Sequence, residues 1–508
     1  MTDHKQQFIK NVGSGWLAQG STAVVGFLAL PMNLHYLGKE VYGISVLALS
    51  AIAILDFLNL GMGPALLRFF SQAIAKNDKE ELAIISSNSQ LVLGSLGVLG
   101  AFFILIGTPF FLSFYEISPT HRHETIILLV CLAAVFFQKF HLLVFSNIVM
   151  ASHRFDYINF INITVSWLRF GLLFLFYRIY APSLMCLGLA TLFANIFGYL
   201  LTILISHNEQ GKDIFFRPKK VVLSRLPSLF SFGMMAMTQS VFFTMSIQVP
   251  VLIMGKILGK ETTALFAPAI LISECVTMML SSVCSQLTPM AAHEMTKKDH
   301  NLARRIRVFG EIVACLGYGC ILIITIFSKD IITLWLGKVF LEMNGVVIVL
   351  VIGYVLASIQ WVIYFTALGT STIAPFAYSS VVMFVLTFLG TLLGTMFWHW
   401  GLLEVALCIS AVRVLRSALF ITWIYSKIFN FSLVRYFFDV YCKPSFAAIV
   451  VFLLATTVQK VFGHSDPKFL TLMAEMFIFA VLYTALTWLM GLSDDTRRLV
   501  IKTNRETK

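Results

Sequence analysis

Six charged residues lie well inside long apolar stretches of this sequence, where an ionised group is unfavourable. They are Asp56, Lys139, Arg169, Glu274, Arg413 and Arg416. A charge near the centre of a bilayer costs roughly 2.5–3.5 kcal/mol on insertion scales, so such side chains avoid lipid. We therefore expect each of them to line an aqueous cavity or to pair with another group inside the protein.

The basic members of this set predict a cavity that binds an anion. Arg413 and Arg416 are three residues apart, so they share one face of a helix. Guanidinium groups bind phosphate oxygens through two parallel hydrogen bonds. With Arg169 and Lys139 they place four cations against two acids, which favours a substrate with an anionic head. The alternative is that acids neutralise these bases in internal ion pairs. The candidate acids are Asp56, Glu404 and Glu475.

The two central acids allow two interpretations. Asp56 and Glu274 occupy nearly matching depths in the second and eighth apolar stretches, so they could carry a coupling proton or sodium ion. They could equally be ion-pair partners of Arg169 and Lys139. The sequence contains neither a metal-ligand spacing nor a GxxxxGK[ST] nucleotide loop. We expect no metal, no cofactor and no ATP hydrolysis.

The elements that carry these residues are membrane spans. Hydrophobic residues make up 58% of the 508 residues, charged residues only 12%, and the mean hydropathy is +0.86, which excludes a soluble protein. A helix that spans a membrane needs about 20 apolar residues, and fourteen apolar stretches of the sequence have this length or nearly so. They are residues 12–36, 41–72, 82–108, 125–150, 157–180, 183–206, 227–256, 263–292, 307–328, 341–368, 373–397, 401–426, 442–462 and 468–491. Open strands cannot face lipid, so all should be helices.

The sidedness of the chain follows from its basic residues. Most of the 37 Lys and Arg residues fall on the loops that share a side with both termini. Positive loops remain in the cytoplasm, so both termini are predicted to be cytoplasmic. The basic loops would then face anionic lipid headgroups, which accounts for the net charge of +12 without nucleic acid as a partner.

A repeated word divides the chain into two similar halves. Leu-Gly-Lys-Glu occurs at 37–40 and at 258–261, and Lys76-Asn-Asp78 lies opposite Lys297-Lys-Asp299 at the same separation. Six spans per half give a parallel repeat, related by an axis along the membrane normal. We predict an all-α fold with two pseudo-symmetric six-helix lobes and two C-terminal helices. The expected parts are an N-lobe at 1–206, a basic cytoplasmic linker at 207–226, a C-lobe at 227–427, and helices 13–14 with a basic tail at 428–508.

Helix breakers and the linker lead to two more local predictions. Prolines inside spans and a Gly-rich segment should bend the helices that contain them. These residues are Pro31, Pro250, Pro268, Pro289, Gly61 and Gly63. The linker mixes basic and apolar residues, so it is predicted to form an amphipathic helix at the membrane surface or else a solvated loop.

The segment "LDFLNLGMGPALLRFFSQAIAKNDKEEL" (55–82) resembles bacterial polysaccharide flippases of the Wzx type, within the multidrug/oligosaccharidyl-lipid/polysaccharide exporter superfamily. The matching residues are Asp56, Gly61, Gly63 and Arg68, followed by the charged loop at Lys76. The resemblance implies transport of an undecaprenyl-pyrophosphate-linked oligosaccharide from the inner to the outer leaflet of the bacterial cytoplasmic membrane, for a surface polysaccharide such as the O-antigen of lipopolysaccharide.

The resemblance also implies a cationic cavity for the sugar–pyrophosphate head. Arg68 is assigned to it by the motif, whereas Arg169, Arg413, Arg416 and Lys139 are nominated on physical grounds. The implied partners are the lipid-linked substrate, membrane lipids, and a polysaccharide polymerase with its chain-length machinery.

Two other functions remain as alternatives. A drug/cation antiporter of the same superfamily would hold an acidic cation site in its first lobe, whereas the first span here contains no acid and the central charge is biased positive. A membrane polysaccharide polymerase or ligase would carry a large outer loop, and the outer loop around 109–124 is short. We therefore expect a transporter rather than an enzyme.

Overall fold

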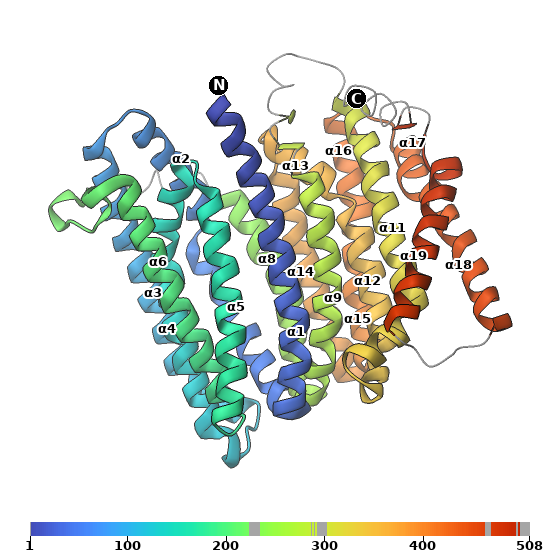
Figure 1. Ribbon diagram of the computed structural model, residues 1–508, viewed down its shortest axis with the longest axis horizontal. Coiled ribbons are helices and arrows are strands. Elements are labelled where there is room, and N and C mark those ends of the chain that lie inside the picture. The colour runs from blue at the N-terminus through green and yellow to red at the C-terminus, as the bar shows by residue number, and fades with distance from the viewer. Residues whose placement is uncertain are drawn as a thin grey trace. The chain divides into compact units, whose positions relative to one another are not determined.

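The computed structural model describes residues 2–222, 234–285, 287–288, 290–291, 302–462, 469–493 and 496–497. In these residues the chain is helical and contains no strand, so the prediction of an all-α fold is confirmed. Figure 1 shows long helices running side by side within each part of the chain. Their length and apolar composition make this a multi-pass membrane protein.

The number of spans agrees with the sequence. Thirteen helical stretches in the described residues are long and apolar enough to cross a membrane. The first, Gly13–Asn59, has 47 residues, about twice the length that a bilayer needs. It is divided at Gly38, whose φ of 75° and ψ of 171° are not helical. Counting its two halves separately gives the fourteen predicted spans.

The first compact unit covers residues 1–264. Its elements are α1 (Thr2–Ile54), the 3-10 segment η1 (Leu55–Asn59), α2 (Met62–Ala75), α3 (Lys79–Phe114), α4 (Pro119–Ala151), α5 (Phe155–Ile179), α6 (Leu184–Gln210), η2 (Gly211–Ile214), η3 (Pro218–Lys220) and α8 (Met234–Ile257). α4 packs against α3 and α6, while α1 packs against α5 and α8. Because α8 packs against α1, this unit extends beyond residue 206. The lobe boundary at residue 206 therefore stays a prediction based on the repeat.

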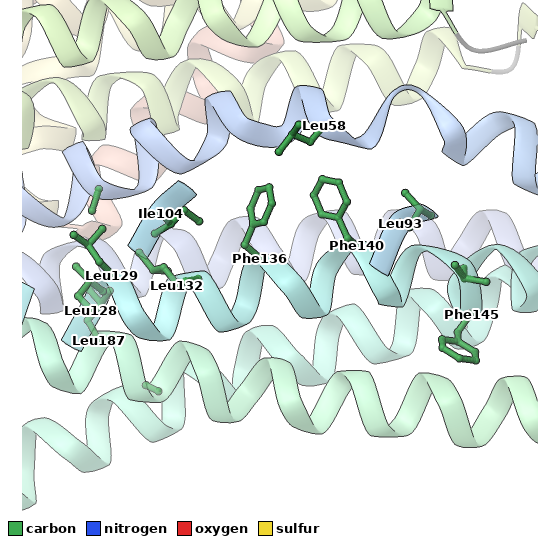
Figure 2. Packing of buried hydrophobic residues seen from close by; sticks show 14 of the residues in the cluster. Leu58, Leu93, Ile104, Leu128, Leu129, Leu132, Phe136, Phe140, Phe145 and Leu187 are labelled. Atoms are coloured by element: carbon green, nitrogen blue, oxygen red, sulfur yellow. The ribbon is translucent and has the colours of Figure 1, made fainter. Parts of the chain in front are cut away.

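The core of the first unit lies around α4. Figure 2 shows Phe136 and Phe140 of α4 pointing toward Leu58 of η1, with Leu93 and Ile104 of α3 on either side. The two phenylalanine rings lie 4.7 Å apart and are almost fully buried. This contact holds the irregular segment that carries Asp56 against α4.

The second compact unit covers residues 265–508. Its first helix, α9 (Lys260–Cys284), begins at the unit boundary. It continues with α11 (Leu302–Trp335), η5 (Lys338–Met343), α12 (Asn344–Ser358), α13 (Trp361–Gly369), α14 (Ala374–Phe397), α15 (Leu402–Val414), η6 (Leu415–Ile421), α16 (Thr422–Ile428), α17 (Leu433–Phe437), η7 (Phe438–Cys442), α18 (Lys443–Phe462), α19 (Phe469–Leu486) and η8 (Thr487–Gly491). The segments η6, η7 and η8 are π-helical.

The helices of the second unit pack around two central helices, α15 and α11. α12 packs against α15, and α14 also packs against α15. α11 packs against α12, α18 and α19. Phe327 of α11 and Phe479 of α19 belong to the apolar core that joins the last two spans to α11.

Both copies of the repeated word form the same turn. Gly38 has a φ of 75° and Gly259 a φ of 97°, in the left-handed region that favours glycine. In each copy one helix ends just before the glycine and the next begins just after it. The repeat is therefore visible as local structure. Lys297-Lys-Asp299 and Pro289 lie outside the described residues.

The prediction of an amphipathic linker helix is wrong for residues 211–222. This segment consists of the short 3-10 turns η2 and η3 with extended backbone after each. Polar side chains of α3 bind its backbone: Ser86 Oγ and Gln90 Nε2 donate to Ile214 O at 2.5 and 2.7 Å, and Asn88 Oδ1 accepts from Val222 N at 2.9 Å. These contacts replace the hydrogen bonds of a helix. Residues 223–226 lie outside the described residues.

Candidate functional site

Asp56 lies where the second span loses its α-helical form. The backbone of Leu60 and Gly61 has φ of 52° and 66°, and Asn59 Oδ1 accepts a hydrogen bond from Gly61 N at 2.8 Å. The predicted bend at Gly61 is confirmed. Because the helix stops there, η1 can turn Asp56 toward α4.

Asp56 forms an ion pair with Lys139 of α4. Lys139 Nζ lies 2.7 Å from both Asp56 Oδ1 and Oδ2. The structure thus selects one of the two interpretations of Asp56, because this acid neutralises one of the predicted cations. The pair is nonetheless accessible, with exposed side-chain fractions of 35% for Asp56 and 58% for Lys139. Exposed charges within apolar spans are unfavourable against lipid and are compatible with an aqueous cavity.

Arg169 is the fifteenth of the 25 residues of α5, and its side chain is exposed. It interacts electrostatically with the phenol of Tyr42 on α1. It makes no hydrogen bond or ion pair with any residue that the structure describes. Arg169 is therefore a cation at the middle depth of a span, and no carboxylate in the described part of the chain pairs with it.

A series of polar contacts fixes α5 against α1. Asn159 Nδ2 donates to Ser14 Oγ at 2.9 Å, and Trp167 Nε1 donates to Ser21 Oγ at 2.8 Å. Farther along, Tyr177 OH donates to Asn33 Oδ1 at 3.1 Å. Polar side chains thus occur along the whole length of this helix pair, and they set the register that brings Arg169 to Tyr42.

In the second unit, three side chains from α9, α12 and α15 form a cluster. The guanidinium carbon of Arg413 lies 4.0 Å from the ring centre of Tyr354, a cation–π contact. Glu274 interacts electrostatically with both Arg413 and Tyr354. Arg413 is buried and Glu274 is partly buried. The structure therefore places one of the predicted coupling acids beside one of the predicted substrate-binding cations.

Arg416 is held by α14 instead. Its Nε donates to Ser379 Oγ at 3.0 Å, and its Nη2 donates to Ser380 Oγ at 2.9 Å and to Phe376 O at 3.3 Å. Arg416 belongs to the π-helical η6, whereas Arg413 lies in the last turn of α15. The two guanidinium groups interact electrostatically, yet each has its own set of neighbours.

The other residues considered in the sequence lie elsewhere. Glu404 Oε2 accepts a hydrogen bond from Gly401 N at 2.9 Å at the start of α15, and Glu475 is exposed on α19. Arg68 is exposed on α2.

Sequence reasoning missed the neutral partners of the cations. Tyr42, Tyr354, Ser379 and Ser380 surround three of the arginines. The adjacent serines of "AYSSVV" and the tyrosines inside spans were the available signal, but such residues are common in membrane helices that contain no site.

The fold defines a multi-pass membrane protein that carries charged residues inside its spans. A model of the polysaccharide biosynthesis protein family matches residues 8–295, more than half of the chain. The chain belongs to that family. The resemblance to polysaccharide proteins that the sequence predicted is thereby confirmed at the level of the family.

Solved structures share the fold at low sequence identity. An inward-facing multidrug resistance MATE family transporter of the MOP superfamily is 14% identical, with a TM-score of 0.70, covering 80% of this chain and 95% of that chain. The lipid II flippase MurJ in an inward closed conformation is 12% identical, with a TM-score of 0.69, covering 93% of this chain and 98% of that chain. Among curated proteins, none matches this sequence significantly.

Proposed function

We propose that this protein moves an oligosaccharide linked to a polyprenyl pyrophosphate from the inner to the outer leaflet of a bacterial cytoplasmic membrane, for surface polysaccharide synthesis. The observation that supports this proposal is the excess of cations in the spans. Arg169, Lys139, Arg413 and Arg416 stand against Asp56 and Glu274, and Arg169 has no carboxylate partner among the described residues.

The physical need for such a protein comes from the cargo. Sugar hydroxyls lose their hydrogen bonds to water in hydrocarbon, and a pyrophosphate loses its hydration as well. Exposed cations at mid-depth offset part of that loss, while the polyprenyl tail stays in lipid. Alternating access of the interior to the two sides would then carry the head across.

Within this proposal, Arg169 binds the anionic head first, because its charge is exposed and uncompensated. Arg413 lies beside Glu274, so protonation of Glu274 would free its guanidinium for the cargo. Glu274 is therefore the candidate coupling acid. Asp56, which is paired with Lys139, has the weaker claim. Both termini would be cytoplasmic, and a polymerase with its chain-length machinery would use the product.

Export of organic cations is the second candidate, because a multidrug transporter shares the fold. The cation excess disfavours it, since a positively charged drug would be repelled by Arg169. A polysaccharide polymerase or ligase has no comparable support among the described residues.

The test is transport by the purified protein in proteoliposomes. A fluorescent polyprenyl-pyrophosphate oligosaccharide is placed in one leaflet, and its appearance in the other is measured by an impermeant quencher. An organic cation serves as the competing substrate. Movement of the lipid-linked sugar without movement of the cation supports the proposal, and the reverse result would reject it in favour of an antiporter.

A further inference from the structure

The second unit contains an apolar groove that the proposed transport does not use. It has a volume of about 670 Å³ and lies between two consecutive spans. One wall consists of Leu415, Ala418, Leu419, Phe420 and Trp423, and the other of Leu433, Val434, Phe437, Phe438 and Cys442. The first wall belongs to η6 and α16, and the second to α17 and η7.

Two π-helical segments form much of this groove. Such segments are rare and occur often at functional sites. η6 contributes four of the lining residues and η7 contributes two. Leu415 and Leu419 of η6 expose about half of their side chains on the groove side, whereas Arg416 of the same segment is buried against Ser379 and Ser380.

Basic side chains gather at the end of the groove where the chain turns from one span to the next. Figure 1 shows α16 and α17 at the same end of the helices. Lys427, in the last turn of α16, places Nζ 3.9 Å from the ring centre of the lining residue Trp423. Arg435 of α17 follows the lining residue Val434, and its side chain is 67% exposed.

These charges exceed the acid that is available to them. Asp439 is nearly buried and interacts with three cations: Lys443 at 2.7 Å, Arg435 at 3.7 Å and Arg307 at 3.9 Å. Lys427 forms no ion pair with any residue in the described part of the chain. Among the described residues, Asp439 is shared by three cations and Lys427 adds a fourth positive group, so this end of the groove is electrostatically suited to a further anion.

We propose that this groove is a binding site for an anionic glycerophospholipid. One acyl chain lies along the apolar walls, and the headgroup phosphate lies between Lys427 and Arg435. The charges stand at a span end, which is the depth of lipid phosphates. The ten lining residues are nearly all apolar, so they match an acyl chain and offer few hydrogen bonds to a sugar head. The site thus binds a resident lipid of the bilayer.

Native mass spectrometry of the full-length protein tests this site. The protein is released from nanodiscs that contain equal amounts of phosphatidylglycerol and phosphatidylcholine. We expect one retained phosphatidylglycerol in preference to phosphatidylcholine. In K427Q/R435Q the preference should fall about thirtyfold, since each basic group near the membrane surface contributes a factor of about five.

A second variant separates the apolar contact from the charges. Leu419→Trp adds bulk on the exposed groove side and should reduce retention of both lipids. The matched control is Arg178→Gln, because Arg178 is also a cation at a span end, 5.4 Å from the Phe174 ring, in the other unit. Equal retention of both lipids in the wild type, or unchanged preference in K427Q/R435Q, would overturn the site. So would displacement of the retained lipid by polyprenyl phosphate, which would assign the groove to the carrier.

Discussion

Lys260 of the second Leu-Gly-Lys-Glu word binds Glu40 of the first, with Nζ 3.2 Å from Glu40 Oε1. The same ammonium donates to Glu116 O at 3.3 Å, and Lys256 Nζ lies 2.7 Å from Glu116 Oε1. Thr263 Oγ1 also donates to Gly43 O at 3.3 Å. The two copies of the repeat therefore contact one another directly at one end of the spans.

Charge reversal at this contact should be rescued by the opposite reversal. Lys260→Glu places like charges beside Glu40, and Glu40→Lys in the same protein restores an attractive pair. An exposed pair contributes only about 0.2–1 kcal/mol, so the single variant should lose little thermal stability but should lower transport. Transport assays of both variants check this. Equal defects in the single and double variants would contradict a direct role of the pair.

Gly43 should tolerate no side chain. A Cβ there would lie 2.0 Å from Lys260 O, so the backbone at the start of α9 would have to move. Gly43→Ala should destabilise the protein by about 1–3 kcal/mol, as overpacking does. Thermal unfolding in detergent measures the change. Gly94→Ala is the control, because a Cβ at Gly94 meets no atom within 4 Å.

The contact at Glu116 should weaken in acid. The hydrogen bond from Lys256, followed by the charges of Lys256 and Lys260, lowers the pKa of Glu116 below its ordinary value of 4.5. A lowered folded-state pKa gives stability that is fully present above the unfolded-state pKa and is lost as pH falls through the folded-state value. The difference in melting temperature between the wild type and Glu116→Gln should therefore shrink below pH 4.5. A difference that does not change with pH would refute the coupling.

The stability of the protein should depend on the planar guanidinium group of Arg416, which makes several hydrogen bonds. Lysine cannot contact Ser379, Ser380 and Phe376 O together, so Arg416→Lys should lose about 1–3 kcal/mol of stability because it leaves polar groups unsatisfied. Arg413→Lys keeps a cation beside Glu274 and should be milder. Chemical denaturation of both variants gives their free energies of unfolding and tests this difference. Equal stability of the two would show that the contacts of Arg416 are dispensable.

The Asp56–Lys139 pair should behave as a unit. Asp56→Asn leaves an uncompensated ammonium in a span and should reduce the amount of folded protein, whereas Asp56→Asn with Lys139→Gln should restore it. Fluorescence-detected gel filtration measures this recovery. If the double variant folds but its transport no longer responds to an ion gradient, Asp56 carries the coupling ion after all.

The sequence predicted the spans and their division well, because apolar length and charge are local properties. It predicted the bend at Gly61, and it placed Gly38 and Gly259 between spans as part of the repeated word, without predicting their positive φ. For Asp56 it could not choose between an ion pair within the protein and a coupling ion, because Lys139 is far away in the chain. The linker was mispredicted because hydrogen bonds from Ser86, Asn88 and Gln90 of α3 determine its form.

The central claim is that interior cations recognise an anionic lipid-linked head, and Arg169 tests it most directly. In proteoliposomes, Arg169→Gln should slow translocation of a polyprenyl-pyrophosphate oligosaccharide by about 10–100-fold, the loss expected for one hydrogen bond to a charged group. Arg169→Lys should be intermediate, and Arg178→Gln, on the same helix, should transport normally. Wild-type rates in Arg169→Gln, in protein that remains folded, would contradict the account.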